Sequence, residues 1–222
     1  MILQDQATAH VVFDCDGTLI DSMRPFYDIL VEILPKHLGR EVTYDEVLEK
    51  FIPEWVGLLQ NFGIENPSKE MMDKMIAETS SINLKSPVPA LYKGIKDCLH
   101  ELEQLGVASY IWTGRDRASG VRIFKAHDIA QYFTEMSFSD TDIPKPHPDG
   151  LERMLEEVPK EKMVLIGDSG VDIQGAKNFS IPCLAVDWES KANHAEFLDF
   201  GATKVVQSPS EIVDWVKSNL IS

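Results

Sequence analysis

The chain has 222 residues, of which 44% are hydrophobic and 26% charged, a composition typical of a folded globular protein with one sizeable core and a smaller module. Its formal net charge of −15 argues against binding to nucleic acid or to an anionic membrane, since both require clusters of Lys and Arg. We therefore expect no nucleic-acid partner and no membrane partner.

Three scattered cysteines, Cys15, Cys98 and Cys183, form no CxxC pair, so neither a disulfide framework nor a zinc site is indicated. The first ten residues have no basic start and no long apolar segment, and no stretch of the chain is apolar over the length of a membrane span. These features are typical of a reducing compartment, and we expect a cytoplasmic protein.

The first predicted element lies in His10–Ser22, which reads HVVFDCDGTLIDS. The apolar run Val11–Phe13 predicts a buried strand, and Asp14 and Asp16 follow it at its carboxyl end. Carboxylates two residues apart in an extended segment point to the same side, and Gly17 allows the backbone to turn away. Two like charges this close favour a cation between them, and Mg²⁺ fits because it takes oxygen ligands.

Residues 21–86 are predicted to form an all-helical insert, because apolar residues recur at helical spacing and no alternating strand pattern interrupts them. Thr43 and Glu46 form a capping-box pattern at one helix start, and Asn66-Pro67 starts another helix. Between them, Pro53 and the apolar residues after it suggest a helix that Gly63 closes. The apolar positions expected to pack inside the insert include Phe26, Leu30, Leu34, Met71, Met72, Met75 and Ile76.

From Pro87 onward, strands and helices alternate, and the strands are nearly continuous apolar runs. This pattern indicates a parallel sheet covered by helices on both faces. We predict an α/β fold: a three-layer Rossmann-like core of residues 1–20 and 87–222, with the helical insert of residues 21–86. The later strands are expected at Val107–Trp112, near Met136–Phe138, at Met163–Ile166, at Cys183–Val186 and, as a short one, at Lys204–Val206.

Polar residues follow these strands at their carboxyl ends, where an open α/β sheet binds its ligands. Thr113-Gly114 follows the second strand, Lys145 lies in the loop after the third, and Asp168 follows the fourth. A carboxylate such as Asp14 can attack phosphorus, and Asp16 can protonate the leaving oxygen and then deprotonate water. Among the other groups, Thr113 offers a hydroxyl donor, Lys145 a positive charge and Asp168 a further metal ligand.

Four short motifs now stand in order: DCDGT, TG after a strand, KP before a helix, and GDSGVD. Together they resemble the haloacid dehalogenase-like hydrolase superfamily, and the resemblance covers the whole chain. The helical insert is similar to the cap that separates the first two motifs in the branch of phosphoglycolate phosphatase and β-phosphoglucomutase. The resemblance implies a phosphatase that acts on a small phosphorylated metabolite through an aspartyl-phosphate on Asp14.

The resemblance also implies a ligand set. Mg²⁺ would be held by the Asp14 side chain, the Asp16 backbone carbonyl and Asp168, and the phosphate by Thr113, Gly114 and Lys145. Two roles are open for Asp172: it could reach the metal shell, or it could orient Lys145. For Arg115, which follows Thr113-Gly114, we expect a solvated side chain rather than a contact with substrate.

Other activities of the superfamily, and one function from another class, remain to be weighed. Dehalogenases and phosphonatases of this superfamily lack an acid at the position of Asp16, which disfavours both. The mutases of the β-phosphoglucomutase type usually carry a histidine ten residues after that acid, where this chain has Phe26. A phospho-acceptor signalling protein is an alternative from another class, and Asp16 disfavours it because it supplies a base for turnover.

The insert is also the expected source of substrate specificity. The core motifs hold only the metal and the phosphoryl group, so groups around the rest of the substrate must discriminate between esters. Its joins, near Asp21-Ser22 and Ser86–Pro89, are polar or contain proline. We expect the insert to act as a lid that closes around a small metabolite and leaves no room for a phosphoprotein.

Overall fold

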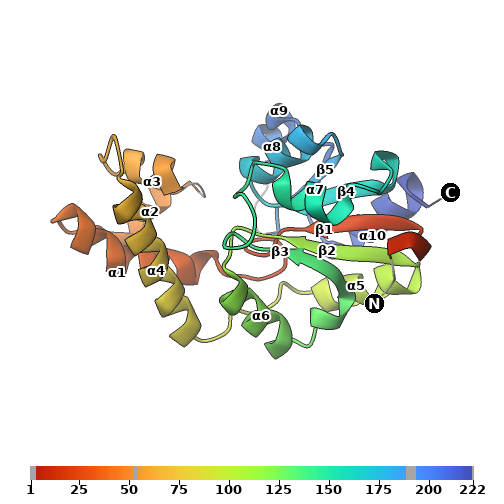
Figure 1. Ribbon diagram of the computed structural model, residues 1–222, viewed down its shortest axis with the longest axis horizontal. Helices are drawn as coiled ribbons and strands as arrows, with labels where there is room; N and C mark the ends of the chain where they lie inside the picture. The colour runs from red at the N-terminus through yellow and green to blue at the C-terminus, as the bar shows by residue number, and fades with distance from the viewer. Residues whose placement is uncertain (1–3, 53–54, 189–193, 222) are drawn as a thin grey trace. The chain divides into compact units, whose positions relative to one another are not determined.

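The computed structural model describes residues 4–52, 55–188 and 194–221 and confirms the α/β fold class (Figure 1). The strands are β1 (Ala9–Phe13), β2 (Val107–Trp112), β3 (Phe133–Ser137), β4 (Met163–Gly167), β5 (Cys183–Val186) and β6 (Lys204–Val206). The helices are α1 (Met23–Leu38), α2 (Tyr44–Lys50), α3 (Trp55–Asn61), α4 (Lys69–Lys85), α5 (Ile95–Gln104), α6 (Arg117–Ala126), α7 (Asp149–Leu155), α8 (Gly170–Phe179), α9 (His194–Phe200) and α10 (Pro209–Asn219). Short 3₁₀ turns lie at Gln4–Gln6, Ala130–Tyr132 and Lys160–Lys162.

The six strands form one parallel sheet in the order β3-β2-β1-β4-β5-β6. The chain builds outward from β1 in one direction through β2 and β3, and from β4 in the other direction through β5 and β6. The order of the strands therefore reverses between β1 and β4, which is where ligands bind in folds of this type. In register, Phe13 lies beside Ile111 of β2 and Ile166 of β4, so the residues after these strands are neighbours.

Helices cover both faces of the sheet, as the apolar strands require (Figure 1). On one face, α7, α8 and α9 pack their apolar residues with those of the strands in a single core cluster. On the other face, α5 packs on β2 and against α10, which also contacts β6. Strands β1, β4 and β5 are buried along their whole length.

The chain divides into two compact units, one of residues 1–21 and 90–222 and the other of residues 22–89. The predicted borders, at residues 20 and 87, lie close to these. The helical unit has its own apolar core, to which α1 contributes Ile29, Leu30, Ile33 and Leu34 and α4 contributes Met75. Each unit therefore buries apolar side chains of its own.

Several local predictions differ from the structure. The third strand begins at Phe133 and ends at Ser137, earlier than predicted, because β3 is an edge strand whose half-exposed Thr134 and Glu135 weaken the apolar signal. In α4, Met75 is buried but Ile76 is 40% exposed, so the predicted stripe is narrower than expected. Helix α9 was not predicted.

Helix starts also differ in detail. Helix α4 begins at Lys69, because Ser68 and not Pro67 caps it through its side chain. At α2, Thr43 accepts a hydrogen bond from the Glu46 backbone as predicted, while the Glu46 carboxylate binds Arg40 and Lys50 instead of completing a capping box. The predicted role of Pro53 lies outside the described residues.

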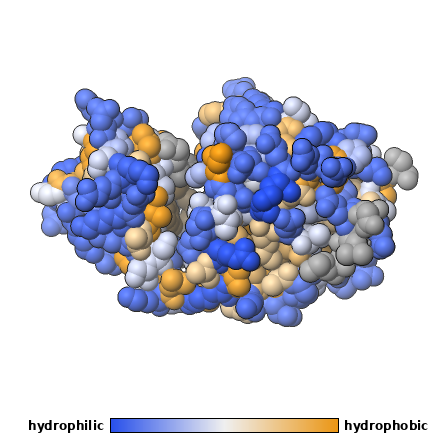
Figure 2. Space-filling view, viewed as in Figure 1, coloured by the Kyte–Doolittle hydropathy of each residue, from blue (hydrophilic) through white to orange (hydrophobic). Residues whose placement is uncertain are grey.

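The surface agrees with the acidic composition, since the face in Figure 2 is mostly hydrophilic with scattered apolar residues. Across the described residues, no helix combines the length and the apolar character needed to cross a bilayer. The three cysteines are buried and unpaired, and Cys15 lies in the core as expected for a residue between two outward-facing acids.

Candidate active site

The site begins where β1 ends. The Asp14 backbone N–H donates to the Ile166 carbonyl of β4 at 2.8 Å, which extends the parallel ladder to the acid itself. The chain then turns sharply at Gly17, which has a φ of 74°. A Cβ at Gly17 would overlap the Asp168 carboxylate, so only glycine lets this turn approach the end of β4.

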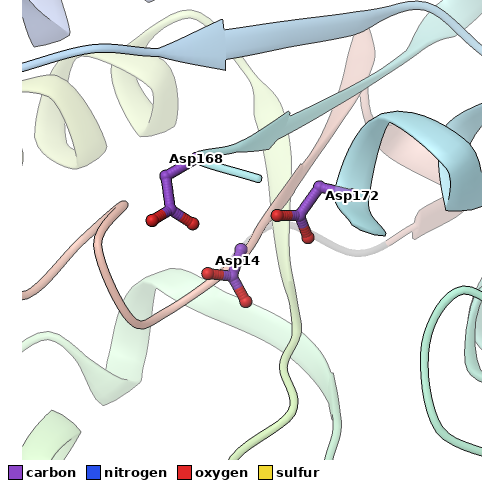
Figure 3. A group of neighbouring side chains, drawn as sticks. All are labelled: Asp14, Asp168 and Asp172. Atoms are coloured by element: carbon purple, nitrogen blue, oxygen red, sulfur yellow. The ribbon is translucent and has the colours of Figure 1, made fainter. Parts of the chain in front are cut away.

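Three carboxylates converge at this edge of the sheet (Figure 3). Asp14 follows β1, Asp168 follows β4, and Asp172 lies in the first turn of α8. One oxygen from each lies within 4.8 Å of the others. The i+2 spacing of Asp14 and Asp16 predicted a shared site for those two side chains, whereas the cluster instead joins Asp14 to residues more than 150 positions away.

Lys145 neutralises part of this negative charge. Its Nζ donates to Asp14 Oδ1 at 2.7 Å and to Asp172 Oδ1 at 2.6 Å, and its side chain is 8% exposed. The ammonium also lies 4.6 Å from the centre of the Trp112 ring, a cation–π contact. Lys145 is thus held by two carboxylates and an aromatic ring.

Both carboxylate oxygens of Asp172 accept hydrogen bonds from protein donors. Its Oδ1 accepts from Lys145, while its Oδ2 accepts from the Ser169 backbone N–H at 3.2 Å and from the Ser169 hydroxyl at 2.6 Å. These bonds cap the start of α8. Within the described residues, by contrast, no donor hydrogen-bonds the Asp168 carboxylate, which leaves its oxygens available to a cation.

Burial dominates the electrostatics of the site. It raises the pKa of Asp14 to about 7 against the opposing effect of Lys145, and the carboxylates of Asp172 and Asp16 add to the increase. Burial and the Asp14 charge likewise raise the pKa of Asp168. Burial opposes the charge of Lys145, but Asp14 and Asp172 outweigh it and raise the pKa of the ammonium. The carboxylates of the site are therefore only partly balanced by positive charge, and a divalent cation would supply the rest.

The donor set fits Mg²⁺. Carboxylate oxygens are the ligands this ion prefers, and it needs only one or two from the protein. Asp14 and Asp168 meet that need: the second oxygen of Asp14 is not used by Lys145, and Asp168 has no protein donor among the described residues. The close approach at Gly17 also keeps this space free of side-chain carbon.

The predicted phosphate-binding residues follow β2, the strand next to β1. Thr113 is buried, and its backbone N–H donates to the Ser137 carbonyl of β3 at 3.1 Å. The Thr113 hydroxyl oxygen accepts from the Arg115 backbone N–H at 3.1 Å, so its own proton remains for another acceptor. Gly114 is exposed, and nothing lies within 4 Å of where a Cβ would be.

Arg115 was expected to be solvated, and this prediction is wrong. Its side chain is 7% exposed, and it binds both carboxylate oxygens of Asp16: Nε donates to Oδ2 at 3.0 Å, and Nη2 donates to Oδ1. The guanidinium matches a carboxylate in this two-point geometry. Arg115 turns inward because the start of α6 lies beside the turn after β1, a contact between residues 99 positions apart.

Sequence reasoning thus missed two groups that contact predicted site residues, Arg115 and Trp112. A usable signal existed for Arg115, since an arginine directly after Thr-Gly at a strand end lies near the acids that end the neighbouring strand. For Trp112 the only signal was a large aromatic residue at the last position of a buried strand.

Comparison with known proteins gives a consistent result. The family model described as "Haloacid dehalogenase-like hydrolase" matches residues 11–186. A phosphoglycolate phosphatase of Vibrio parahaemolyticus is 28% identical over 208 residues, covering 84% of this chain and 86% of its own. The tyrosine-protein kinase PtkA of Mycobacterium tuberculosis is 27% identical over 206 residues, covering 91% of this chain and 69% of its own.

Among solved structures, a hydrolase of the haloacid dehalogenase-like family from Streptococcus pneumoniae shares the fold with a TM-score of 0.77 at 23% identity, covering 93% of this chain and 97% of its own. The family match begins within β1 and ends with β5, and so includes every residue of the site described above. This chain therefore belongs to the haloacid dehalogenase-like hydrolase family.

Proposed function

We propose that this protein is a Mg²⁺-dependent phosphatase that hydrolyses a small phosphate monoester through an aspartyl-phosphate on Asp14. The observation that carries the proposal is the cluster of the buried Asp14 and Asp172 and the half-buried Asp168, with the ammonium of Lys145 bound to the first two. Such a cluster combines a nucleophile, a cation for phosphate oxygens and room for a metal at one edge of the sheet. The phosphoglycolate phosphatase relative supports the choice of a small substrate.

The first half-reaction would transfer the phosphoryl group. A carboxylate oxygen of Asp14 forms a bond to phosphorus while the bond to the ester oxygen breaks, and Asp16 gives its proton to the departing alcohol. Lys145 and Thr113 would donate hydrogen bonds to the phosphoryl oxygens, where negative charge is concentrated. The products of this step are the alcohol and phosphorylated Asp14.

The second half-reaction would release phosphate. Asp16, now a carboxylate, takes a proton from water as the water oxygen bonds to phosphorus and the bond to Asp14 breaks. Asp14 returns to its carboxylate form, and inorganic phosphate leaves. Each proton that Asp16 gives in the first step is thereby recovered in the second.

Mg²⁺ would be held by the side chains of Asp14 and Asp168 and by the Asp16 backbone carbonyl. When bound, it would neutralise charge on the carboxylates and on the phosphoryl group. Because both oxygens of Asp172 already accept hydrogen bonds, we propose that Asp172 positions Lys145 and does not bind the metal.

Metal dependence is the first test. Purified protein with Mg²⁺ should hydrolyse p-nitrophenyl phosphate, and a chelator should stop release of nitrophenol until Mg²⁺ is restored. The reason is that, without the cation, the buried carboxylates repel both one another and the substrate. Equal rates with and without the chelator would contradict the metal assignment.

The roles of the two N-terminal acids are tested by intact-mass spectrometry. Asp14→Asn should form no phosphoprotein, because it lacks the nucleophile. Asp16→Asn should still be phosphorylated by p-nitrophenyl phosphate, whose leaving group needs little protonation, but should lose the base for the second step. A phosphoryl group trapped on Asp14→Asn would reverse the assignment.

The fate of the phosphoryl group separates hydrolysis from the other uses of an aspartyl-phosphate. A mutase returns it to a second hydroxyl of a sugar, and a signalling phospho-acceptor keeps it. We expect inorganic phosphate to form in many equivalents per protein with no added acceptor. Release that stops after one equivalent would favour the signalling alternative.

A further inference from the structure

We propose that Arg115 is a positioning residue: its guanidinium holds the Asp16 carboxylate in the one orientation that serves both proton transfers. This inference rests on the proposed phosphatase function, in which Asp16 gives and then takes a proton. It adds a residue that lies after the second motif and that has no part in the two half-reactions described above.

The contact between the two side chains is directional. Nε of Arg115 donates to Oδ2 of Asp16 at 3.0 Å, and Nη2 donates to Oδ1. A planar guanidinium that engages both oxygens fixes the rotation of the carboxyl group as well as its distance. A lysine would supply the same charge at one point and would leave that rotation free.

Exposure differs between the partners. The Arg115 side chain is 7% exposed and that of Asp16 is 30% exposed, so the cation is enclosed while the acid keeps an open side. Water or a substrate can therefore approach Asp16 from its exposed side. Burial opposes the charge of Arg115, but Asp16 outweighs it and raises the pKa of the guanidinium, which therefore stays charged.

The backbone under each partner is fixed. The Arg115 N–H donates to the Thr113 hydroxyl oxygen at 3.1 Å, and its carbonyl accepts from the Ser139 N–H at 3.1 Å. On the other side, the turn that carries Asp16 is closed by the Gly17 N–H, which donates to the Ile20 carbonyl at 3.0 Å. A bidentate pair between two fixed segments leaves the Asp16 carboxylate little freedom.

Asp116, a second acid that could pair with Arg115, is bound to its own helix. Asp116, the next residue, accepts from the Ser119 backbone N–H at 3.0 Å and from the Ser119 hydroxyl at 2.6 Å, which caps α6. Its carboxylate is thereby turned to its own helix. The two neighbouring residues therefore have different roles: Asp116 caps the start of α6, and Arg115 binds Asp16.

The test compares Arg115→Gln and Arg115→Lys with the wild type on two esters. An alkyl phosphate, glycerol 2-phosphate, needs a proton for its leaving group, whereas p-nitrophenyl phosphate needs little help. We expect Arg115→Gln to lower kcat/KM for the alkyl ester by about 100-fold, within the range of a lost general acid. The first equivalent of nitrophenol should be released nearly as fast as in the wild type.

The second readout is phosphoprotein. Because a misplaced Asp16 is also a poor base, Arg115→Gln should accumulate a phosphoryl group on Asp14 during turnover of p-nitrophenyl phosphate, as expected for Asp16→Asn. Arg115→Lys keeps the charge but not the two-point contact, so it should accumulate the same species. Arg117→Gln, which removes an exposed arginine two residues away, is the matched control and should accumulate none.

A double variant completes the design. If Arg115 acts through Asp16, adding Arg115→Gln to Asp16→Asn should slow the alkyl ester no further, because coupled residues are not additive. Equal losses on both esters without phosphoprotein, or full activity in Arg115→Lys, would overturn the proposal. If Arg115→Gln fails to fold, as judged by thermal unfolding, Arg115→Lys alone decides. A wild type that hydrolyses neither ester would instead refute the proposed function itself.

Discussion

At the scale of single residues, His10 shows how burial controls charge away from the proposed catalytic groups. Its imidazole is buried in β1, and Nδ1 lies 3.1 Å from the Tyr110 hydroxyl on the neighbouring strand. Burial, together with the nearby charge of Lys162, lowers the pKa of His10 from 6.5 to about 4. His10 is therefore neutral in the folded protein at pH values where an unfolded chain would protonate it.

This difference predicts a pH dependence of stability. The folded-state pKa of His10 lies below the unfolded value, so the unfolded chain binds the extra proton, and stability falls as pH decreases from about 6.5 to about 4. At about 1.4 kcal/mol per pKa unit, the shift from 6.5 to about 4 corresponds to a loss of at most about 3.5 kcal/mol. Comparison of denaturant unfolding at several pH values should show a smaller decrease for His10→Gln than for the wild type.

The exposed His100 provides the control for this measurement. His100→Gln removes an imidazole from the surface, so it shows the effect of losing a histidine without a change in the core. If His10→Gln and the wild type have the same slope, then burial of the imidazole does not contribute to the acid sensitivity of the protein.

At the scale of elements, the end of β2 supports the loop that carries Lys145. Trp112 is 2% exposed, and its ring lies against the Lys145 ammonium. A Cβ at Gly175 of α8 would overlap this ring, and one at Gly150 of α7 would contact it. Helices α7 and α8 thus have glycine where the Trp112 ring needs space. The ring in turn packs against the Lys145 ammonium.

We therefore predict that Trp112→Leu weakens binding of inorganic phosphate as well as stability. Loss of the indole from the core should cost about 2–3 kcal/mol of unfolding free energy. Loss of the cation–π contact, worth about 0.5–2 kcal/mol, should raise the inhibition constant for phosphate roughly 2- to 30-fold. Both values can be measured on one preparation, by chemical unfolding and by product inhibition.

Tyr110→Leu separates the two effects. Tyr110 is buried on the same face of β2 two residues earlier, and it belongs to the same core cluster. Its loss should lower stability without a change in phosphate binding. If both variants weaken phosphate binding to the same degree, Trp112 acts through general stability and not through Lys145.

At the scale of the whole molecule, the helical unit of residues 22–89 is proposed to select the substrate. All the groups assigned to the metal and to the phosphoryl group lie in the other unit, so they recognise features common to every phosphate ester. Discrimination between esters then requires further contacts, and we propose that the helical unit supplies them. The chain leaves and re-enters the core at adjacent points, since the Asp21 N–H donates to the Ala90 carbonyl at 2.9 Å.

These adjacent ends allow a direct test, in which residues 22–89 are replaced by a short flexible linker. We expect the intact protein to prefer small sugar and organic-acid phosphates over a phosphopeptide at equal concentration, because a closed site has no room for a polypeptide. The shortened protein should lose the ranking among small substrates. An unchanged ranking, or a preference of the intact protein for the phosphopeptide, would contradict this role.

The linker variant needs its own check of folding. The core cluster on the sheet face covered by α7, α8 and α9 contains residues of β1, β2, β4 and β5 and, among the described residues, none from 22–89. We therefore expect cooperative unfolding to persist. Retention of Mg²⁺-dependent nitrophenol release would show that the proposed catalytic groups are intact in the shortened protein.

Much of this architecture was determined by sequence alone. Apolar runs predicted β2 and β5 with their observed bounds and β4 to within one residue, and the acids, Thr113 and Lys145 followed the strands at the ends where parallel sheets bind ligands. Such signals are local, because the side chains that a strand buries are read from its own residues. The sequence pattern was weak for β3, whose edge position admits polar residues, and for α9, in which only Phe197 is buried.

What only the tertiary structure decided is which side chains meet. The sequence left Asp172 with two possible roles and predicted a solvated Arg115. In the folded chain, Asp172 accepts from Lys145 and Ser169, and Arg115 binds Asp16 from 99 residues away. These pairings depend on strand order, which places β2 and β4 on either side of β1. Local pattern predicts that a polar residue follows a strand, but its partner is set by the neighbouring strands, which come from distant parts of the chain.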